Sequence, residues 1–91
     1  MAKKLIIYGS KECSRCHDAK EVLDREGIRY GYVDILESLA HLMKYLNIRD
    51  AHPDVFAEPI SNKKVGLPAY VVDDEHVYTG AIAEMDLDLF R

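Results

Sequence analysis

Cysteine is scarce in this sequence. Of the 91 residues only Cys13 and Cys16 are cysteines, and only Ser14 and Arg15 lie between them. A disulfide between such close residues closes almost no loop, so it would add little stability as a crosslink. In a reducing compartment, a cysteine pair at this spacing is more often a metal-ligand pair or a redox centre.

Long apolar runs and excess positive charge are also missing. The longest apolar run is about four residues, far too short to cross a membrane. The opening Met-Ala-Lys-Lys resembles the basic end of a signal peptide, but the stretch 8–12 stops the apolar segment too early for one. Lys and Arg total 12 against 16 Asp and Glu, which provides no electrostatic basis for binding DNA or RNA. We therefore expect a cytoplasmic protein that binds neither membranes nor nucleic acid.

The composition is that of one small folded domain. Apolar residues make up 48% of the chain, which is enough for one modest core over residues 1–91. No repeat or low-complexity tract divides the chain. Apolar runs and helical periodicity predict elements in the order β-α-β-α-β-β-α. Their predicted ranges are 4–8, 14–26, 30–33, 36–46, 69–72, 76–79 and 83–90.

The middle of the chain carries two local signals. Asp34 and Glu37 have the spacing of a capping box in front of the second helix. Pro53 and Pro59 break any long element between 47 and 66. Pro53 is placed to open a short helix that ends at Phe56.

The element order predicts the fold class. Two strands joined through a helix usually pair in parallel within one sheet, with a right-handed crossover. The last two strands are separated only by 73–75 and form an antiparallel hairpin. We predict an α/β thioredoxin fold, with a four-stranded mixed sheet and helices on both faces. Four tyrosines on the predicted strands are expected in the core or in cross-strand pairs: Tyr8, Tyr30, Tyr32 and Tyr70.

Cys13 and Cys16 fall where the first strand gives way to the first helix. A helix N-terminus offers free backbone N–H groups and a partial positive charge, and both stabilise a thiolate. Lys11 and Arg15 add positive charge nearby. Cys13, at the mouth of the helix, is therefore predicted to attack disulfides. Cys16, one turn further in, is predicted to be more buried and to resolve the mixed disulfide.

Three other uses of the pair stay open. A tetrahedral zinc site needs four ligands, so Cys13, Cys16 and His17 would need a fourth from elsewhere. The candidates for it are His41, His52 and His76. The run 13–17 also matches c-type haem attachment, which would need export and a chain that wraps the haem. The third alternative is an iron–sulfur protein that uses Cys13 and Cys16.

The residues around the pair resemble the glutaredoxin family. The matching positions are Leu5-Ile6-Ile7-Tyr8, Lys11, Cys13-x-x-Cys16-His17, Ala19-Lys20, Leu23, Gly27 and Asp34, and Gly66-Leu67-Pro68 is similar to the family's Thr-Val-Pro. The resemblance implies the thioredoxin fold, attack by Cys13 and a cis peptide bond before Pro68. A cis bond there would turn the Leu67 backbone outward, so that an extended substrate can pair with it as an added strand.

Three departures from the family pattern bear on the substrate. The family's Pro-Tyr between the cysteines is Ser14-Arg15 here, and the segment 47–64 is longer. The segment 78–84 lacks the family's glutathione-binding Gly-Gly followed by acidic residues. It looks more like the Ser-Gly-Phe segment of glutaredoxin-like redoxins that serve ribonucleotide reductase and are reduced by thioredoxin reductase.

The predicted activity is thiol–disulfide oxidoreduction on protein disulfides or glutathione mixed disulfides. Cys13 and Cys16 are the predicted catalytic pair. The substrate-binding candidates are Lys11, Arg15, Leu67, Pro68 and Gly80. We expect no metal and no bound cofactor, with glutathione as a candidate co-substrate. The expected partners are a disulfide-containing protein or glutathione, with thioredoxin reductase as a further candidate, and we expect the chain to be a monomer.

Overall fold

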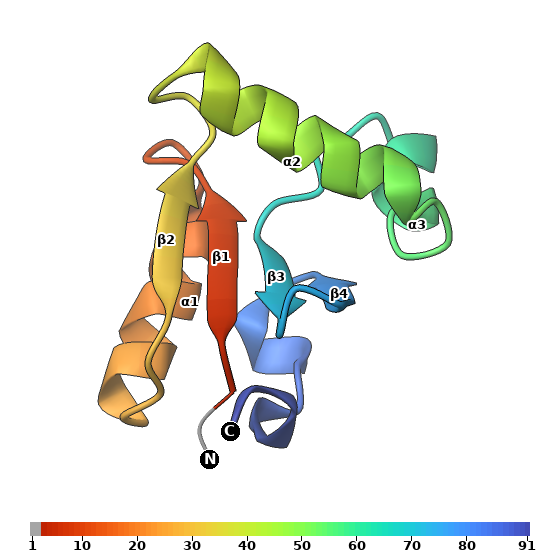
Figure 1. The fold of residues 1–91 in the computed structure, drawn as a ribbon. Helices are drawn as coiled ribbons and strands as arrows, with labels where there is room; N and C mark the ends of the chain where they lie inside the picture. Colours follow the sequence, from red (N-terminus) through yellow and green to blue (C-terminus); the bar gives the residue numbers. More distant parts are fainter. Residues whose placement is uncertain (1–2) are drawn as a thin grey trace.

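A mixed sheet with the strand order β2-β1-β3-β4 organises the computed structural model, which describes residues 3–91 (Figure 1). Met1 and Ala2, which open the basic start of the sequence, lie outside the described residues. The elements in chain order are β1 (Leu5–Gly9), α1 (Ser14–Arg25), β2 (Gly31–Asp34), α2 (Leu39–Ala51), α3 (Ala57–Ser61), β3 (Ala69–Val72), β4 (His76–Thr79) and the 3-10 helices η1 (Ile82–Glu84) and η2 (Leu87–Phe90).

The strand pairing follows from the connections. β1 and β2, which are joined through α1, pair in parallel, whereas β3 pairs antiparallel with β1. β3 and β4 form an antiparallel hairpin. Ile7 at the centre of β1 is opposite Tyr32 of β2 and Tyr70 of β3. The predicted mixed four-stranded sheet is confirmed.

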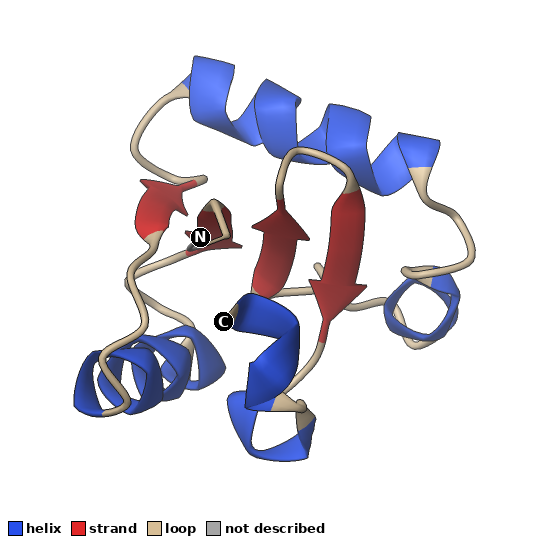
Figure 2. Ribbon diagram, turned by 60° about the horizontal axis from the view of Figure 1, so that its bottom comes forward, coloured by secondary structure: helices blue, strands red, loops and turns tan. Residues whose placement is uncertain are grey.

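Alternate residues of the strands build two cores, one on each face of the sheet. Leu5 and Ile7 pack in a cluster with residues of α1, η1 and η2. Tyr8 packs in a second cluster with Tyr45 of α2 and with Phe56. Figure 2 shows the same arrangement, with the long helix α2 above the sheet and α1 and the 3-10 helices below it. The predicted helices on both faces are therefore confirmed.

The second helix begins later than the sequence predicts, at Leu39 rather than 36. The Ser38 hydroxyl accepts a hydrogen bond from the His41 N–H at 3.1 Å and so caps the helix. The Asp34 carboxylate accepts instead from the Leu36 N–H at 2.9 Å, which closes a turn before the helix. The predicted capping box is wrong. The helix also continues to Ala51, because Ile48 still packs against the core.

Two other predicted helices differ from the structure. Residues 53–56 form a turn, and the short helix α3 follows them, with Pro59 in its first turn, where no intrahelical N–H is needed. The predicted helix 83–90 is instead the pair of 3-10 helices η1 and η2. Met85 is extended, and the Asp86 carboxylate caps a new turn by accepting from the Asp88 N–H at 3.0 Å.

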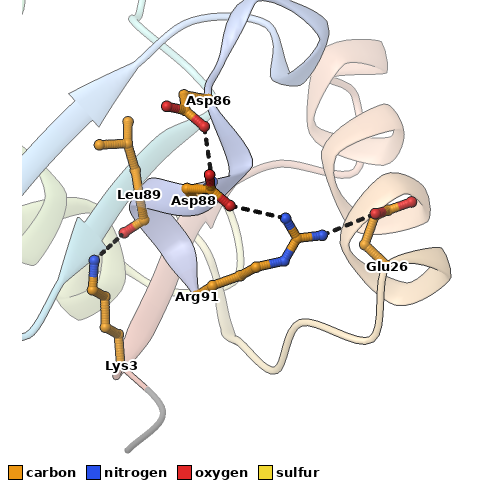
Figure 3. A network of polar contacts seen from close by, with 6 residues as sticks. All are labelled: Lys3, Glu26, Asp86, Asp88, Leu89 and Arg91. Atoms are coloured by element: carbon orange, nitrogen blue, oxygen red, sulfur yellow. Dashed lines mark hydrogen bonds and ion pairs between the residues drawn. The ribbon is translucent and has the colours of Figure 1, made fainter.

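Polar contacts at the C-terminus connect the last turn to residues that follow α1 and precede β1 (Figure 3). Arg91 pairs with Glu26, just after α1, at 3.0 Å and with Asp88 at 3.1 Å. The Lys3 ammonium group donates to the Leu89 carbonyl at 3.2 Å. These contacts lie at the end of the sheet where β1 begins, whereas Cys13 follows the other end of β1 (Figure 1). Among residues 3–91, no helix has the length and apolar character needed to span a membrane.

Candidate active site

Cys13 occupies the N-cap of α1. Its backbone is extended, and its sulfur accepts a hydrogen bond from the Cys16 N–H at 3.2 Å. The Cys13 carbonyl accepts from the Cys16 and His17 N–H groups, which begins the helix. The Cys13 side chain is half-buried, so its sulfur meets both solvent and the helix N-terminus. The N-cap position places this sulfur against the partial positive charge of the helix N-terminus.

Cys16 lies one turn along α1 and is completely buried, with 0% of its surface exposed. Both cysteines are free thiols. Burial in the first place, and then the hydrogen bond with Cys13, raises the pKa of the Cys16 thiol to about 12. The expected asymmetry is confirmed in its geometry, with an accessible thiol at the helix mouth and a protected thiol behind it.

The raised pKa of Cys16 predicts a loss of stability at alkaline pH. The unfolded thiol ionises near its ordinary pKa of 9.0, whereas the folded thiol holds its proton until about 12. Between these values only the unfolded state releases the proton. The stabilisation is therefore complete below about pH 9 and is lost as the pH rises toward 12.

Urea unfolding of the reduced protein at several pH values between about 8 and 10 measures this effect, below the range in which most tyrosines ionise. We expect the free energy of unfolding to fall more steeply above about pH 9 in the natural chain than in Cys16→Ala. Equal slopes in the two proteins would show that ionisation of Cys16 is not coupled to folding.

Gly9 makes room for the buried sulfur. A β-carbon at position 9 would stand 2.8 Å from the Cys16 sulfur and 2.5 Å from the Tyr32 hydroxyl oxygen. No side chain fits at those distances unless the side chains of Cys16 and Tyr32 move. Glycine at the end of β1 therefore lets the first turn of α1 approach the sheet closely.

The loop before β3 faces the cysteine pair. The Leu67–Pro68 peptide bond is cis, as the family resemblance implies. Pro68 is fully buried, whereas Leu67 is partly exposed. Gly66 has a φ of +94°, a conformation that favours glycine. A β-carbon there would also lie only 2.9 Å from the Tyr45 hydroxyl oxygen.

Side chains from two layers hold the backbone of this loop. Tyr45 of α2 donates from its hydroxyl to the Val65 carbonyl at 2.6 Å, and Arg49 donates to the same oxygen at 3.3 Å. On the other side, the Thr79 hydroxyl lies 2.7 Å from the Gly66 carbonyl oxygen and 3.1 Å from that of Pro68. Because α2 and β4 both contact it, the loop has a defined position next to Cys13.

An open groove of about 570 Å³ runs between the cysteine loop and the loop before β3. Its walls include Cys13 and Arg15 on one side and Val65 and Leu67 on the other. Leu36, 59% exposed, and Val65, 51% exposed, leave apolar surface open at its rim. The remaining lining residues are Ser10, Glu12, Ser14, Ile35, Lys64 and Gly66.

A second groove of about 310 Å³ adjoins the first and shares Arg15, Lys64, Gly66 and Leu67 with it. Its other walls come from β4 and the turns beside it, and from the long segment before β3. These residues are Val55, Glu58, Pro59, Asn62, Thr79, Gly80 and Glu84. The segment 47–64 therefore reaches the candidate site, and it is more than a surface insertion because its Phe56 is fully buried.

The structure brings together most of the predicted site residues. Arg15 and Leu67 border both grooves, and Gly80 borders the second. Pro68 lies buried beneath the loop. Lys11 is exposed and lines neither groove, and its carbonyl accepts a hydrogen bond from the His17 ring at 2.7 Å.

The sequence model of one family, glutaredoxin, matches residues 5–77. The chain belongs to the glutaredoxin family. A comparison with curated proteins finds no match. The matched range includes the cysteine pair and Pro68, and it ends before Gly80. The segment 78–84, which lacks the family's glutathione-binding pattern, lies entirely beyond the match.

The donor groups of this glutaredoxin-family site bear on the metal alternatives. Within residues 3–91, no three side chains of His, Cys, Asp or Glu gather in a way that could hold a metal ion. The His17 ring nitrogen contacts the Lys11 carbonyl, and the His41 ring contacts the Asp34 carbonyl at 3.0 Å. Nothing in the arrangement favours zinc over redox chemistry for the pair.

Sequence reasoning missed the residues that position the two reactive loops. Tyr45 and Thr79 act on backbone carbonyls far away in the chain, and such contacts leave no local pattern. Tyr32 was expected in a structural role, yet its hydroxyl points toward the Cys16 sulfur. The one available signal was its place on β2. It lies opposite Ile7, which is two residues before the end of β1.

Proposed function

We propose that this glutaredoxin-family protein is a dithiol thiol–disulfide oxidoreductase. The observation that carries the proposal is the unequal burial of the two cysteines at the start of α1. The Cys13 sulfur borders an open groove and accepts a helix N–H, whereas Cys16 is fully buried one turn away. An accessible sulfur with a stabilised negative charge is a nucleophile, and a protected second thiol nearby is a resolving group.

The proposed reaction has two displacement steps. The Cys13 thiolate attacks one sulfur of the substrate disulfide, a bond between those sulfurs forms, and the other substrate sulfur leaves as a thiol. Cys16 then attacks the Cys13 sulfur and releases the rest of the substrate as a second thiol. The substrate gains two electrons and two protons, and Cys13 and Cys16 end as a disulfide. An external thiol must reduce that disulfide before the next cycle.

The groove supports an extended substrate segment that lies against Leu67. Leu67 is partly exposed and lines the groove with Cys13, and main-chain pairing with an added strand suits such a position. Apolar surface from Leu36 and Val65 at the rim fits apolar side chains next to the substrate disulfide. Arg15 and Lys64 offer positive charge for a carboxylate of a peptide or of glutathione.

A trapping experiment tests the order of the two steps. Cys16→Ser keeps Cys13 but removes the resolving thiol, so mixing it with bis(2-hydroxyethyl) disulfide should yield a lasting adduct on Cys13, detected by intact mass. The natural chain should instead pass on to the Cys13–Cys16 disulfide. An adduct that persists equally in both proteins would contradict resolution by Cys16.

The electron donor is proposed on the same basis and is tested separately. A coupled assay would supply either glutathione with glutathione reductase or thioredoxin reductase, and would follow NADPH oxidation with the same disulfide. We propose thioredoxin reductase as the donor, because 78–84 lacks the glutathione-binding pattern. Turnover with glutathione alone would identify glutathione as the donor instead.

A further inference from the structure

The Tyr32 hydroxyl lies over the buried cysteine. A β-carbon on Gly9 would lie 2.5 Å from the Tyr32 hydroxyl oxygen and 2.8 Å from the Cys16 sulfur, so both atoms border the same small space. The hydroxyl therefore lies beside that sulfur, on the side that faces Gly9. Tyr32 therefore reaches from β2 across the end of β1 to the first turn of α1.

The neighbouring Tyr30 makes a different contact. Its hydroxyl donates to the Asp24 carboxylate at 2.9 Å, near the end of α1 and away from the cysteines at its start. The Tyr32 ring carries the Lys20 ammonium group 4.3 Å from its centre. This cation–π contact holds the Tyr32 ring in place. The Tyr32 hydroxyl is thus the polar group that lies next to the Cys16 sulfur.

We propose that the Tyr32 hydroxyl is the hydrogen-bond donor that makes the buried Cys16 sulfur an effective nucleophile in the resolving step. The proposal rests on the dithiol function proposed above and names a further catalytic residue for it. A completely buried sulfur has no water to stabilise the negative charge that it gains on losing its proton. A fixed hydroxyl beside it supplies that stabilisation without rearrangement.

The step balances with Tyr32 keeping its own proton. Cys16 loses its thiol proton and attacks the Cys13 sulfur, so that the Cys13–Cys16 bond forms. The bond between Cys13 and the substrate sulfur breaks, and that sulfur leaves and takes up one proton. The two electrons of the new bond come from Cys16, and those of the broken bond leave with the substrate sulfur. The Tyr32 O–H bond stays intact throughout.

The ionisation tendencies agree with this division of roles. Burial has the largest effect on the pKa of Cys16 and raises it, whereas hydrogen bonding from the Tyr32 hydroxyl lowers it. Burial first, and then negative charge on Cys16, raises the pKa of Tyr32 well above its ordinary value of 10.0. Tyr32 therefore stays protonated as a donor while Cys16 is the group that ionises.

The test is the lifetime of the mixed disulfide on Cys13. The reduced protein is mixed with bis(2-hydroxyethyl) disulfide, quenched in acid at successive times and measured by intact mass. Tyr32→Phe removes only the hydroxyl, so we expect the adduct to persist at least about tenfold longer than in the natural chain, the size expected for a hydrogen bond to a charged group. Tyr30→Phe, the matched control, loses a surface hydrogen bond and should leave the lifetime unchanged.

The first step is measured separately in a Cys16→Ser background, where resolution does not occur. Adduct formation should have the same rate with tyrosine or phenylalanine at position 32. An unchanged adduct lifetime in Tyr32→Phe, or an equal slowing of the first step, would overturn the proposal. If no adduct forms on Cys13 even in Cys16→Ser, the dithiol function itself is wrong, and the two failures are thereby distinguished.

A measurement on the unaltered protein covers the case in which Tyr32→Phe does not fold. With carbon-13 at the tyrosine Cζ position, the Tyr32 resonance should move when the Cys13–Cys16 disulfide forms, because its hydroxyl loses a thiol partner. The Tyr30 resonance should stay in place. A Tyr32 resonance that is the same in the reduced and oxidised proteins would refute the contact on which the proposal depends.

Discussion

Replacing Cys13 with serine is expected to abolish disulfide reduction, with turnover lower by at least about a thousandfold. Serine preserves the N-cap, because its hydroxyl can accept the Cys16 N–H that the Cys13 sulfur accepts now. The fold should therefore survive, as equal thermal unfolding of the two proteins would demonstrate. A hydroxyl in the same place is hardly ionised at neutral pH, so the groove retains its shape but loses its nucleophile.

The comparison with Cys16→Ser separates this loss from general damage to the site. Cys13→Ser should form no adduct with a small disulfide, whereas Cys16→Ser should form one and hold it. Turnover is measured with saturating electron donor, so that the chemical steps on the protein limit the rate. Disulfide reduction that survives in Cys13→Ser would show that another group attacks the substrate.

The strands and the first helix could be predicted from the sequence because their signals are local. Apolar runs at 4–8 and 69–72 form β1 and β3 within a residue, because burial on both faces of the sheet requires apolar side chains at every position. Cys13 sits at the predicted start of a helix and is its N-cap. The parallel pairing of β1 and β2 follows from the helix between them.

The boundaries of the other helices depend on which of several side chains caps the helix, and the periodicity of apolar residues does not decide this. Asp34 and Ser38 both have the chemistry of an N-cap, and the fold uses the first for a turn and the second for the helix. Near the C-terminus, the spacing of Leu87 and Phe90 suits one turn of α-helix or one of 3-10 helix equally well. The extended Met85 and the Asp86 cap interrupt the helix, and the pieces that remain are short 3-10 helices.

Some residues of the candidate site could be predicted from the sequence, whereas others could be found only in the structure. The spacing of Cys13 and Cys16, together with their place between a strand and a helix, identified the pair, and the family resemblance implied the cis bond before Pro68. Tyr32 and Tyr45 could not be found, because each acts through a hydroxyl that meets its partner only after the sheet and helices have packed. Residues that react can be read from a short motif, whereas residues that position them are determined by the tertiary structure.

Phe56→Ala is expected to cause the largest loss of stability. The Phe56 ring is completely buried between the turn before α3 and the loop at Gly66, and it meets the Tyr45 ring edge-on with 6.0 Å between ring centres. Truncation of a buried phenylalanine costs about 3–5 kcal/mol in the free energy of unfolding. Small domains are stable by only about 5–15 kcal/mol, so urea unfolding should show that the variant keeps only a small free energy of unfolding.

This substitution should also weaken the site at temperatures where the variant stays folded. A β-carbon on Gly66 would lie 3.0 Å from the Phe56 ring, so the ring supports the loop directly. It also supports Tyr45, whose hydroxyl holds the Val65 carbonyl at the groove wall. Without the ring, the loop can move away from Cys13, and the rate of adduct formation with a peptide disulfide should fall while that with a small disulfide changes less.

Ile60→Ala is the matched control, because it removes an apolar side chain from α3 that is 45% exposed. It should change the free energy of unfolding by less than about 1 kcal/mol and leave both rates unaltered. If Phe56→Ala lost stability but reacted with peptide and small disulfides at natural rates, the segment 47–64 would serve the core alone. A selective loss with the peptide would mean that this segment maintains the groove in which the substrate chain binds.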